Sequence, residues 1–349
     1  MAYHFNLPLI TQLTIGQQAA LNETNAISIS GGPGTGKSVV SLWRHIRNYA
    51  TGSKKSLLLT YTKTLEYYLK ATAKSEDANA AVAVNRTYRW TYQNRNAVAS
   101  PIYDEIIVDE AQDVEHARYE ILKKCTNAIS YGADDQQSVY PDKATSQREL
   151  EELFPNNNRY FLDENFRNSY EIMRFSKGLF PGKVIQQSAL TNLLEEGRRG
   201  PKPVLLVSNH DKEKENQAII DVIEQFRSVT HNIAILVPLQ RHVNQYANMV
   251  RAAGIECSKF STDDGDFGEI DNVHVTTFKS SKGAEFDTVI IPDFGAMMSN
   301  ISNLRVIAEN DYYVGITRAR RNLYLISAFT PGFMERSAEQ KSTYSKEIL

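Results

Sequence analysis

The sequence predicts an α/β protein of two domains, each with a parallel sheet flanked by helices. Short apolar runs alternate along the chain with segments of helical length, such as 212–226 and 240–253. Runs such as 106–108 and 289–291 are apolar and β-branched throughout, as is typical of strands buried on both faces of a parallel sheet. The length of 349 residues corresponds to about two domains of roughly 150 residues each.

The apolar runs give the expected strands, with helices between them and right-handed crossovers joining them. The expected strands lie at 26–30, 56–61, 81–84, 105–109, 128–132, 159–162, 204–207, 233–237, 273–278, 288–292 and 323–327. The polar segment 155–158 precedes a new apolar run, so we expect one domain at 1–160 and the other at 161–349. The last segment, 337–349, is polar and is expected to form a short helix or a frayed tail.

Composition excludes several classes of protein. The 39 Lys and Arg against 41 Asp and Glu give a formal net charge of −2, which excludes a wholly basic nucleic-acid coat or a polybasic membrane binder but permits a local basic groove. The two cysteines, Cys125 and Cys257, lie far apart without a CxxC pattern, which favours a reducing compartment over a zinc site or a disulfide scaffold. The chain shows neither a signal-peptide pattern nor an apolar run long enough to span a membrane, so we expect a cytoplasmic protein that does not engage membranes.

A phosphate-binding loop is the strongest local signal. The run from Gly31 to Ser38 reads GGPGTGKS, has the P-loop spacing, and lies between an apolar strand and a helical segment. Glycines let backbone N–H groups turn toward a polyphosphate, and the helix N-terminus adds a favourable dipole. A glycine-rich turn without a ligand is the alternative, and the match at every fixed position disfavours it. The residues expected to bind nucleotide here are Gly32, Pro33, Gly34, Thr35, Gly36, Lys37 and Ser38.

Two acids follow the apolar run 106–108 and form the second signal. A strand that ends in acids places them at the carboxyl edge of a sheet, beside a phosphate loop. We expect Lys37 to reach the β- and γ-phosphates of ATP, and Ser38 and Asp109 to bind Mg²⁺. Glu110 is expected to accept a proton from the attacking water. The alternative for such acids is a helix N-terminus, which also favours Asp and Glu.

With these motifs in hand, the sequence resembles the superfamily 1 helicases of the UvrD/Rep type from about residue 13 to residue 327. Residues 109–113 read DEAQD, and 132–140 resemble the GDxDQSIY motif of that family. Residues 277–286 resemble TxHxxKGxEF, and 313–319 match YVGxTRA almost letter for letter. The resemblance implies two RecA-like domains, the first binding ATP and the second supplying arginine fingers, with ATP hydrolysed at the cleft between them.

The resemblance also implies contacts to the base and the sugar of the nucleotide. Gln17 lies where the family has an adenine-reading glutamine, whose amide can both donate and accept, and Gln18 is the rival. The NFR triplet at 165–167 resembles the family's NYR motif, which implies that Phe166 lies against adenine. Glu285 corresponds to a residue that binds ribose.

Three more residues correspond to family positions around the γ-phosphate. Gln137 matches a glutamine that senses this phosphate, and Arg167 and Arg318 match two arginines that contact it. Guanidinium groups neutralise charge that spreads over the transferring phosphoryl group. Together with Lys37 and Glu110, these residues form the expected catalytic set. A surface ion pair is the alternative for either arginine.

A nucleic-acid interface is also implied. Aromatic rings stack on bases of any sequence, and neighbouring cations meet phosphates. Burial of these aromatic residues in the core or in a domain interface is the alternative. The expected strand-contacting residues are Tyr61, Thr62, Thr87, Tyr88, Arg89, Tyr140, Lys143 and Lys279.

Departures from the family pattern bear on function. Segments 87–109 and 207–233 are too short for the accessory insertions of UvrD-like helicases, and Lys279 replaces a histidine. From the family motifs we expect an ATP-dependent helicase or translocase on single-stranded DNA, moving 3′ to 5′, with RNA left open as a substrate.

The missing insertions motivate an alternative, which is an ATP-controlled switch subunit that regulates a partner nuclease or complex without robust unwinding. A partner would then supply duplex-binding or nuclease function. A metabolic kinase is disfavoured because the downstream arginine motifs have no role in one.

Overall fold

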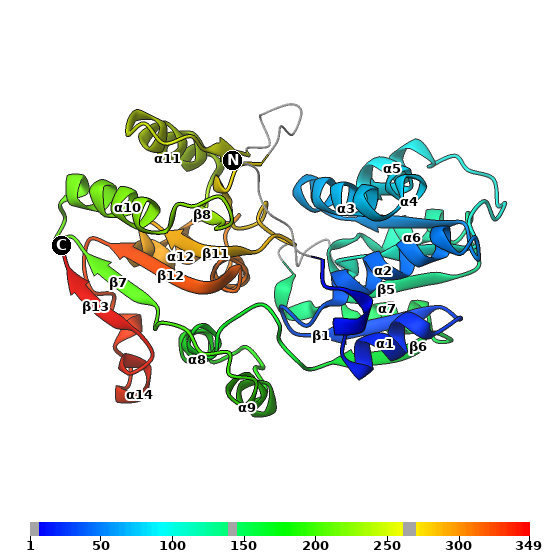
Figure 1. Cartoon of the computed structure of the whole chain (residues 1–349), viewed down its shortest axis with the longest axis horizontal. Helices are drawn as coiled ribbons and strands as arrows, with labels where there is room; N and C mark the ends of the chain where they lie inside the picture. Colours follow the sequence, from blue (N-terminus) through cyan, green and yellow to red (C-terminus); the bar gives the residue numbers. More distant parts are fainter. Residues whose placement is uncertain (1–6, 139–144, 261–269) are drawn as a thin grey trace. The chain divides into compact units, whose positions relative to one another are not determined.

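The computed structural model describes residues 7–138, 145–260 and 270–349, and these fall into two compact units. The first unit ends at Phe166, and the second runs from Arg167 to Leu349. Each unit is built around its own parallel sheet with helices against it (Figure 1). The first unit therefore includes the whole strand Asn158–Leu162. The domain boundary predicted at residue 160 would divide this strand.

The first unit contains a six-stranded sheet in the order β3-β2-β4-β5-β1-β6, and every pairing in it is parallel. Its strands are β1 Ile27–Gly31, β2 Ser56–Thr60, β3 Val84–Arg86, β4 Glu105–Val108, β5 Ile129–Ala133 and β6 Asn158–Leu162. Its helices are α1 Ile15–Asn22, α2 Lys37–Ala50, α3 Lys63–Glu76, α4 Ala78–Val82, α5 Thr87–Gln93, α6 His116–Leu122 and α7 Gln147–Leu153. Short 3₁₀ turns lie at η1 Ile10–Gln12, η2 Ala111–Asp113 and η3 Asp135–Gln137.

Helices cover both faces of this first sheet, because neighbouring strand residues belong to different cores. Leu58 and Ile107 pack in one apolar cluster together with side chains of α1, α2 and α3. Leu57 and Ile106 pack in a second cluster with side chains of α5 and α6. Burial on both faces explains why these strands contain continuous apolar runs, at 57–59 and 106–108, rather than apolar residues at alternate positions.

The second unit contains a seven-stranded sheet in the order β13-β7-β12-β11-β8-β10-β9, again with parallel pairings. Its strands are β7 Val204–Val207, β8 Ile233–Val237, β9 Ser258–Lys259, β10 Val273–Thr277, β11 Phe286–Ile291, β12 Ala319–Ser327 and β13 Ser345–Ile348. Its helices are α8 Tyr170–Leu179, α9 Gln187–Glu195, α10 Lys212–Phe226, α11 Gln240–Ala252, α12 Met297–Asn303, α13 Glu309–Ile316 and α14 Ala338–Lys341, with 3₁₀ turns η4 Phe294–Ala296 and η5 Gly332–Met334.

The predicted fold class is confirmed, while one expected strand is wrong and the expected tail is only partly right. A strand was expected at 81–84, but α4 extends to Val82 because the Asp77 carboxylate caps this helix by accepting from Asn79 N and Ala80 N. The strand β3 begins only at Val84, the last residue of the expected range. The tail was expected to be a short helix or frayed; it does form the short helix α14, but it then continues as strand β13, which pairs in parallel with β7. Most of β13 is exposed, so its sequence is polar and gives no strand signal.

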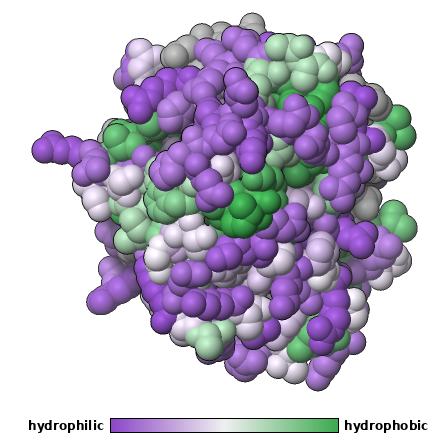
Figure 2. All heavy atoms as spheres, turned by 90° about the vertical axis from the view of Figure 1, so that its left-hand side faces the viewer, coloured by the Kyte–Doolittle hydropathy of each residue, from purple (hydrophilic) through white to green (hydrophobic). Residues whose placement is uncertain are grey.

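Figure 2 shows the face of the second unit on which β13 lies. Polar side chains predominate on this face, and apolar side chains form separate patches. No helix in the described part of the chain has both the length and the apolar character that crossing a bilayer requires.

Candidate nucleotide site and nucleic-acid interface

The phosphate loop joins the end of β1 to the start of α2, as the sequence predicted. Gly36, the residue before α2, has φ of 86°, and Gly31, at the end of β1, has φ of 149°. An added Cβ at Gly31 would lie 2.2 Å from the carbonyl oxygen of Leu162. Both positions therefore require glycine, and the backbone of the loop adopts a course that other residues would resist.

The Lys37 ammonium lies within this loop. Its Nζ donates to the carbonyl oxygens of Gly31 at 2.7 Å and Gly32 at 2.8 Å, and it lies 3.9 Å from Oδ2 of Asp134. The side chain is 8% exposed, so these acceptors are needed to compensate its loss of water. The loop thus holds a cation at the position where the P-loop pattern predicts one.

Asp109 follows β4 and is buried. Burial and the neighbouring Glu110 carboxylate raise the pKa of Asp109 to about 7, while a hydrogen bond from Ser38 and the Lys37 charge act in the opposite direction. Its Oδ2 has no hydrogen-bond partner among the described residues. A buried carboxylate oxygen beside a hydroxyl offers the hard oxygen donors that Mg²⁺ prefers, so Asp109 and Ser38 fit this ion.

Glu110 belongs to a network of amides and carboxylates. Its backbone has φ of 56°, unusual for a residue with a side chain, and its Oε2 accepts from Gln112 Nε2 at 2.7 Å. Gln112 Oε1 accepts from Asp134 N at 3.1 Å, and Asp134 Oδ2 accepts from Gln137 Nε2 at 2.6 Å. The network therefore links Glu110 to Gln137 through Gln112 and Asp134. Sequence reasoning missed the last two residues, although both lie inside motifs that it had singled out.

Gln17 is bound to the phosphate loop. Its Oε1 accepts from Thr14 N at 3.0 Å, and its Nε2 donates to the carbonyl oxygen of Thr35 at 3.0 Å. The rival Gln18 donates instead to Leu13 O, next to its own helix. Phe166 also meets the loop, because its backbone N–H donates to Gly34 O at 2.8 Å. The structure thus brings Gln17 and Phe166 to the same loop as Lys37.

The second unit brings together the three residues predicted for ribose and phosphate contacts. Glu285 precedes β11, and its carboxylate pairs with Arg167 at 3.1 Å and with Arg320 at 3.8 Å. Arg318 precedes β12 and is 1% exposed. Its guanidinium donates to Ala284 O at 3.3 Å, next to Glu285, and to Val314 O at 3.0 Å. Whether these groups contact a nucleotide stays a prediction.

Two of the residues predicted to contact a nucleic-acid strand have structural bonds. Thr62 caps α3, its hydroxyl accepting from Leu65 N at 3.1 Å. Thr87 is buried, and its hydroxyl donates to Thr60 O at 3.2 Å. Tyr61 is half-buried against the apolar cluster that holds Leu57. These residues shape the ends of β2 and β3, whatever else they contact.

Helix α5 presents an aromatic and basic surface. Tyr88 is 57% exposed, and the Arg118 guanidinium lies over its ring, 4.2 Å from the centroid. Tyr92 is 56% exposed one turn later, with Arg95 over its ring at 4.3 Å. Arg89 is exposed between them. Tyr88 is therefore not buried in the core, and its contact with a strand stays a prediction. The sequence gave no indication that Arg118, which is distant in sequence, stacks on this ring.

Lys279 lies just after β10 in the second unit. Its Nζ is 3.7 Å from Oδ1 of Asp311, a residue of α13 with no exposed surface. Burial raises the pKa of Asp311 to about 6, while Lys279 and Lys282 nearby oppose the shift. The remaining two predicted strand contacts, Tyr140 and Lys143, lie outside the described residues.

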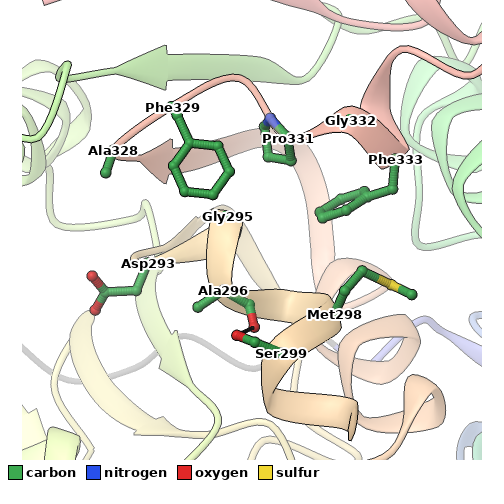
Figure 3. Close-up of a pocket in the computed structure, with 10 residues that line it drawn as sticks. All are labelled: Asp293, Gly295, Ala296, Met298, Ser299, Ala328, Phe329, Pro331, Gly332 and Phe333. Atoms are coloured by element: carbon green, nitrogen blue, oxygen red, sulfur yellow. Dashed lines mark hydrogen bonds between the residues drawn. The ribbon is translucent and has the colours of Figure 1, made fainter.

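A separate cavity of about 480 Å³ lies in the second unit and is drawn in Figure 3. Phe329 and Phe333 line one side of it, and Met298 of α12 lies across from them. Gly295 completes the wall, where an added Cβ would lie 2.4 Å from Ser327 Oγ. Among the described residues, none that the sequence analysis assigned to nucleotide or strand contact lines this cavity.

A phosphate loop after β1, paired acids after β4 of the same sheet and two parallel α/β units define a P-loop NTPase. Comparison with known proteins narrows this class. A family model described as "AAA domain" matches residues 15–141, and one described as "UvrD-like helicase C-terminal domain" matches residues 258–330. Together with the helicase relative described next, these matches support a UvrD-like superfamily 1 helicase; the first model lies within the first unit and the second model within the second unit.

Individual relatives are distant. A protein named as a putative ATP-dependent DNA helicase, R568 of Acanthamoeba polyphaga mimivirus, is 26% identical over 247 residues, and the match covers 64% of this chain and 34% of that protein. The RecBCD enzyme subunit RecB of Chlamydia pneumoniae is 34% identical over 70 residues, 20% of this chain and 6% of RecB. The chain thus spans about a third or less of these relatives.

Two solved structures were also found. The PRRSV helicase matches with a TM-score of 0.44 and 15% identity over 90% of this chain and 54% of its own. The C-terminal domain of a possible DNA helicase from Lactobacillus plantarum matches with a TM-score of 0.37 and 18% identity, over 52% of this chain and 98% of its own.

Proposed function

We propose that the chain is an ATP-dependent motor on single-stranded nucleic acid, which it moves along or unwinds. One observation carries the proposal: Lys37, Asp109 and Glu110 come together beside a P-loop, in a chain whose second unit matches a UvrD-like helicase C-terminal domain. DNA as the strand and 3′-to-5′ as the direction are the finer parts of this proposal, supported by the UvrD-like motifs.

The first unit is proposed to bind ATP and Mg²⁺ and to activate the attacking water. When bound, Mg²⁺ supplies positive charge to the phosphate oxygens, and Ser38 and Asp109 would hold it. Lys37 exchanges its neutral carbonyl acceptors for charged phosphate oxygens, which make the stronger hydrogen bonds. Glu110 takes the proton of the water, while its bond from Gln112 keeps the carboxylate in place.

The second unit is proposed to supply the cations that neutralise the transferring phosphoryl group. Arg167 and Arg318 are the candidates, with Glu285 on the ribose. In this structure Arg167 pairs with Glu285, and Arg318 is bound to backbone carbonyls. Engagement of a nucleotide would therefore rearrange these bonds, which makes hydrolysis conditional on a conformational change.

Strand binding is proposed to involve the aromatic and basic surface of α5. Tyr88 offers an exposed ring for a base, and Arg89 and Arg118 offer charge for neighbouring phosphates. Lys279 would contribute from the second unit. Free, buried Cys125 and Cys257 support the proposal that the protein works in a reducing compartment such as the cytoplasm.

ATP hydrolysis measured with and without single-stranded DNA or RNA tests the proposal. We expect the strand to stimulate hydrolysis, and Lys37→Ala or Glu110→Gln to lower the rate by about 100-fold or more. Glu110→Gln keeps the shape of the side chain and its contact with Gln112, so nucleotide binding should persist in that variant. Lys123→Ala is the matched control, because this lysine is exposed on α6 and pairs with Glu120. Equal rates of ATP hydrolysis with and without single strands would contradict the proposed motor function.

An ATP-controlled switch that regulates a partner nuclease or complex is the second candidate. The similarity to part of RecB, the subunit of a complex by its name, favours it. A strand-displacement assay on the isolated chain separates the two functions. Robust unwinding by the chain alone supports the motor, whereas ATP-dependent capture of a partner without unwinding supports the switch.

A further inference from the structure

A second cavity in the second unit, of about 360 Å³, lies where helices α8, α9 and α14 meet. Figure 1 shows these helices on the same side of the unit, and α8 contacts both of the others. Its lining is more polar than that of the cavity in Figure 3, and includes Arg174, Lys177 and Gln340. Residues of the nucleotide site and of the α5 surface do not line it within the described part of the chain.

Two cations face this cavity from one side of α8. Arg174 donates to Ser342 Oγ at 2.8 Å, and Lys177 donates to Gln187 Oε1 at 3.0 Å. The described residues offer neither cation a carboxylate within ion-pair distance, although Glu339 also lines the cavity. A guanidinium carries five N–H donors and an ammonium three, so most of this donor capacity remains for a ligand.

Gln340 adds a buried donor. It is 4% exposed, and its Nε2 has no hydrogen-bond acceptor among the described residues. Its backbone is fixed, because Gln340 N donates to Ser337 Oγ at 3.1 Å and Gln340 O accepts from Thr343 Oγ1 at 2.6 Å. A buried amide without an acceptor is unfavourable, and an anionic ligand in the cavity would satisfy it.

We propose that this cavity binds a phosphomonoester. Arg174 and Lys177 together outweigh the single negative charge of the exposed Glu339, so the cavity favours an anion, and the fork of an arginine suits a phosphate better than other side chains do. The volume exceeds that of a single ion and lies in the range of small-ligand pockets, so an organic group attached to the phosphate has room. The phosphomonoester can come from a free small molecule or from the end of a nucleic-acid strand. The proposal does not depend on the function proposed above.

Calorimetric titration of the full-length chain tests this site. The probes are inorganic phosphate, a nucleoside 5′-monophosphate, and one short oligonucleotide with and without a 5′-phosphate. Every protein carries Lys37→Ala, which weakens binding at the P-loop. Arg174→Gln with Lys177→Gln is expected to weaken binding of the phosphorylated probes by about tenfold or more. Arg336→Gln with Lys341→Gln is the matched control, since both are exposed cations close to the cavity that do not line it.

The results of these titrations distinguish a small-molecule phosphomonoester from a strand end, and some results would overturn the proposal. Binding of the monophosphate identifies a small-molecule site, and binding of the oligonucleotide that requires its 5′-phosphate identifies a strand end. Gln340→Leu and Arg174→Lys are milder variants for the case in which the double variant does not fold, and both should weaken the same binding. The proposal is overturned if no phosphorylated probe binds with a Kd below about 1 mM. Equal weakening in the double variant and its control would also overturn it.

Discussion

Replacing Gly36 by alanine tests how Gln17 braces the phosphate loop. An added Cβ at Gly36 would lie 2.4 Å from Gln17 Nε2, the atom that donates to Thr35 O at 3.0 Å. The methyl group and this hydrogen bond cannot occupy the same space. Gly36→Ala should therefore expel the Gln17 amide from the loop.

The expected magnitude follows from two effects. The φ of 86° at Gly36 is left-handed, and an L side chain there costs about 1–2 kcal/mol. Loss of the buried hydrogen bond from the Gln17 amide costs about 1–3 kcal/mol more, so Gly36→Ala should destabilise the first unit by about 2–5 kcal/mol. Gly52 provides the control, because its φ is 62° with nothing within 4 Å of an added Cβ. Gly52→Ala should cost only the backbone contribution of about 1–2 kcal/mol.

Urea unfolding followed by tryptophan fluorescence measures these effects in the first unit alone, because the chain's two tryptophans, Trp43 and Trp90, both lie there. Adding Gln17→Ala removes the clashing amide, so Gly36→Ala in that background should cost no more than Gly52→Ala. ATP affinity should fall with Gly36→Ala in parallel with stability. If Gly36→Ala and Gly52→Ala destabilise equally in the native background, Gln17 does not brace the loop.

Three further predictions concern stability, pH and strand binding. Glu105 is buried and accepts from Arg44 Nε at 2.7 Å, so Glu105→Gln should lower the free energy of unfolding of the first unit by about 3–5 kcal/mol, and a loss near zero would contradict this. Burial raises the pKa of Asp311 from 3.8 to about 6, so the stability linked to this carboxyl is present below its ordinary pKa and is lost as pH rises through about 6. Asp311→Asn should remove that fall and stabilise the second unit by up to about 3 kcal/mol near neutral pH, measured by calorimetry; an unaltered pH profile would count against it. Tyr88→Ala should weaken single-strand binding by about 1–3 kcal/mol in a fluorescence titration, whereas Phe161→Ala, an exposed aromatic on β6 at the other edge of the sheet, should not.

Much of the fold and of the nucleotide site could be predicted because these elements carry local patterns. Strand β4 is apolar at nearly every position since both of its faces are buried, and the acids that follow it mark the carboxyl edge of the sheet. Gly36 and Lys37 lie at the start of α2, where the motif requires a left-handed glycine before the helix. Such features depend on neighbours in sequence, so a single chain reveals them.

The remainder depends on partners that are distant in sequence. Strand β13 pairs through its backbone at an exposed edge, and its polar side chains give no strand pattern. Arg118 lies over Tyr88, and Asp134 N donates to Gln112, which belongs to a different motif; no single motif fixes either contact. Positions of this kind are determined by the packing of the unit, which a local pattern does not contain.

The cations predicted to meet phosphate share one property in this structure: their own units supply acceptors for them. Lys37 donates to Gly31 O, Arg318 donates to Val314 O, and Arg167 pairs with Glu285. Buried cations without acceptors would destabilise the nucleotide-free protein, so these bonds keep the site folded while it is unliganded. A backbone carbonyl is a neutral acceptor and a phosphate oxygen is a charged one, so the exchange favours nucleotide for the first two cations. Arg167 would instead leave the Glu285 carboxylate, which is already a charged acceptor, so its contact with a phosphate gains less free energy. Removal of the Glu285 carboxylate should therefore make the contact between Arg167 and phosphate more favourable.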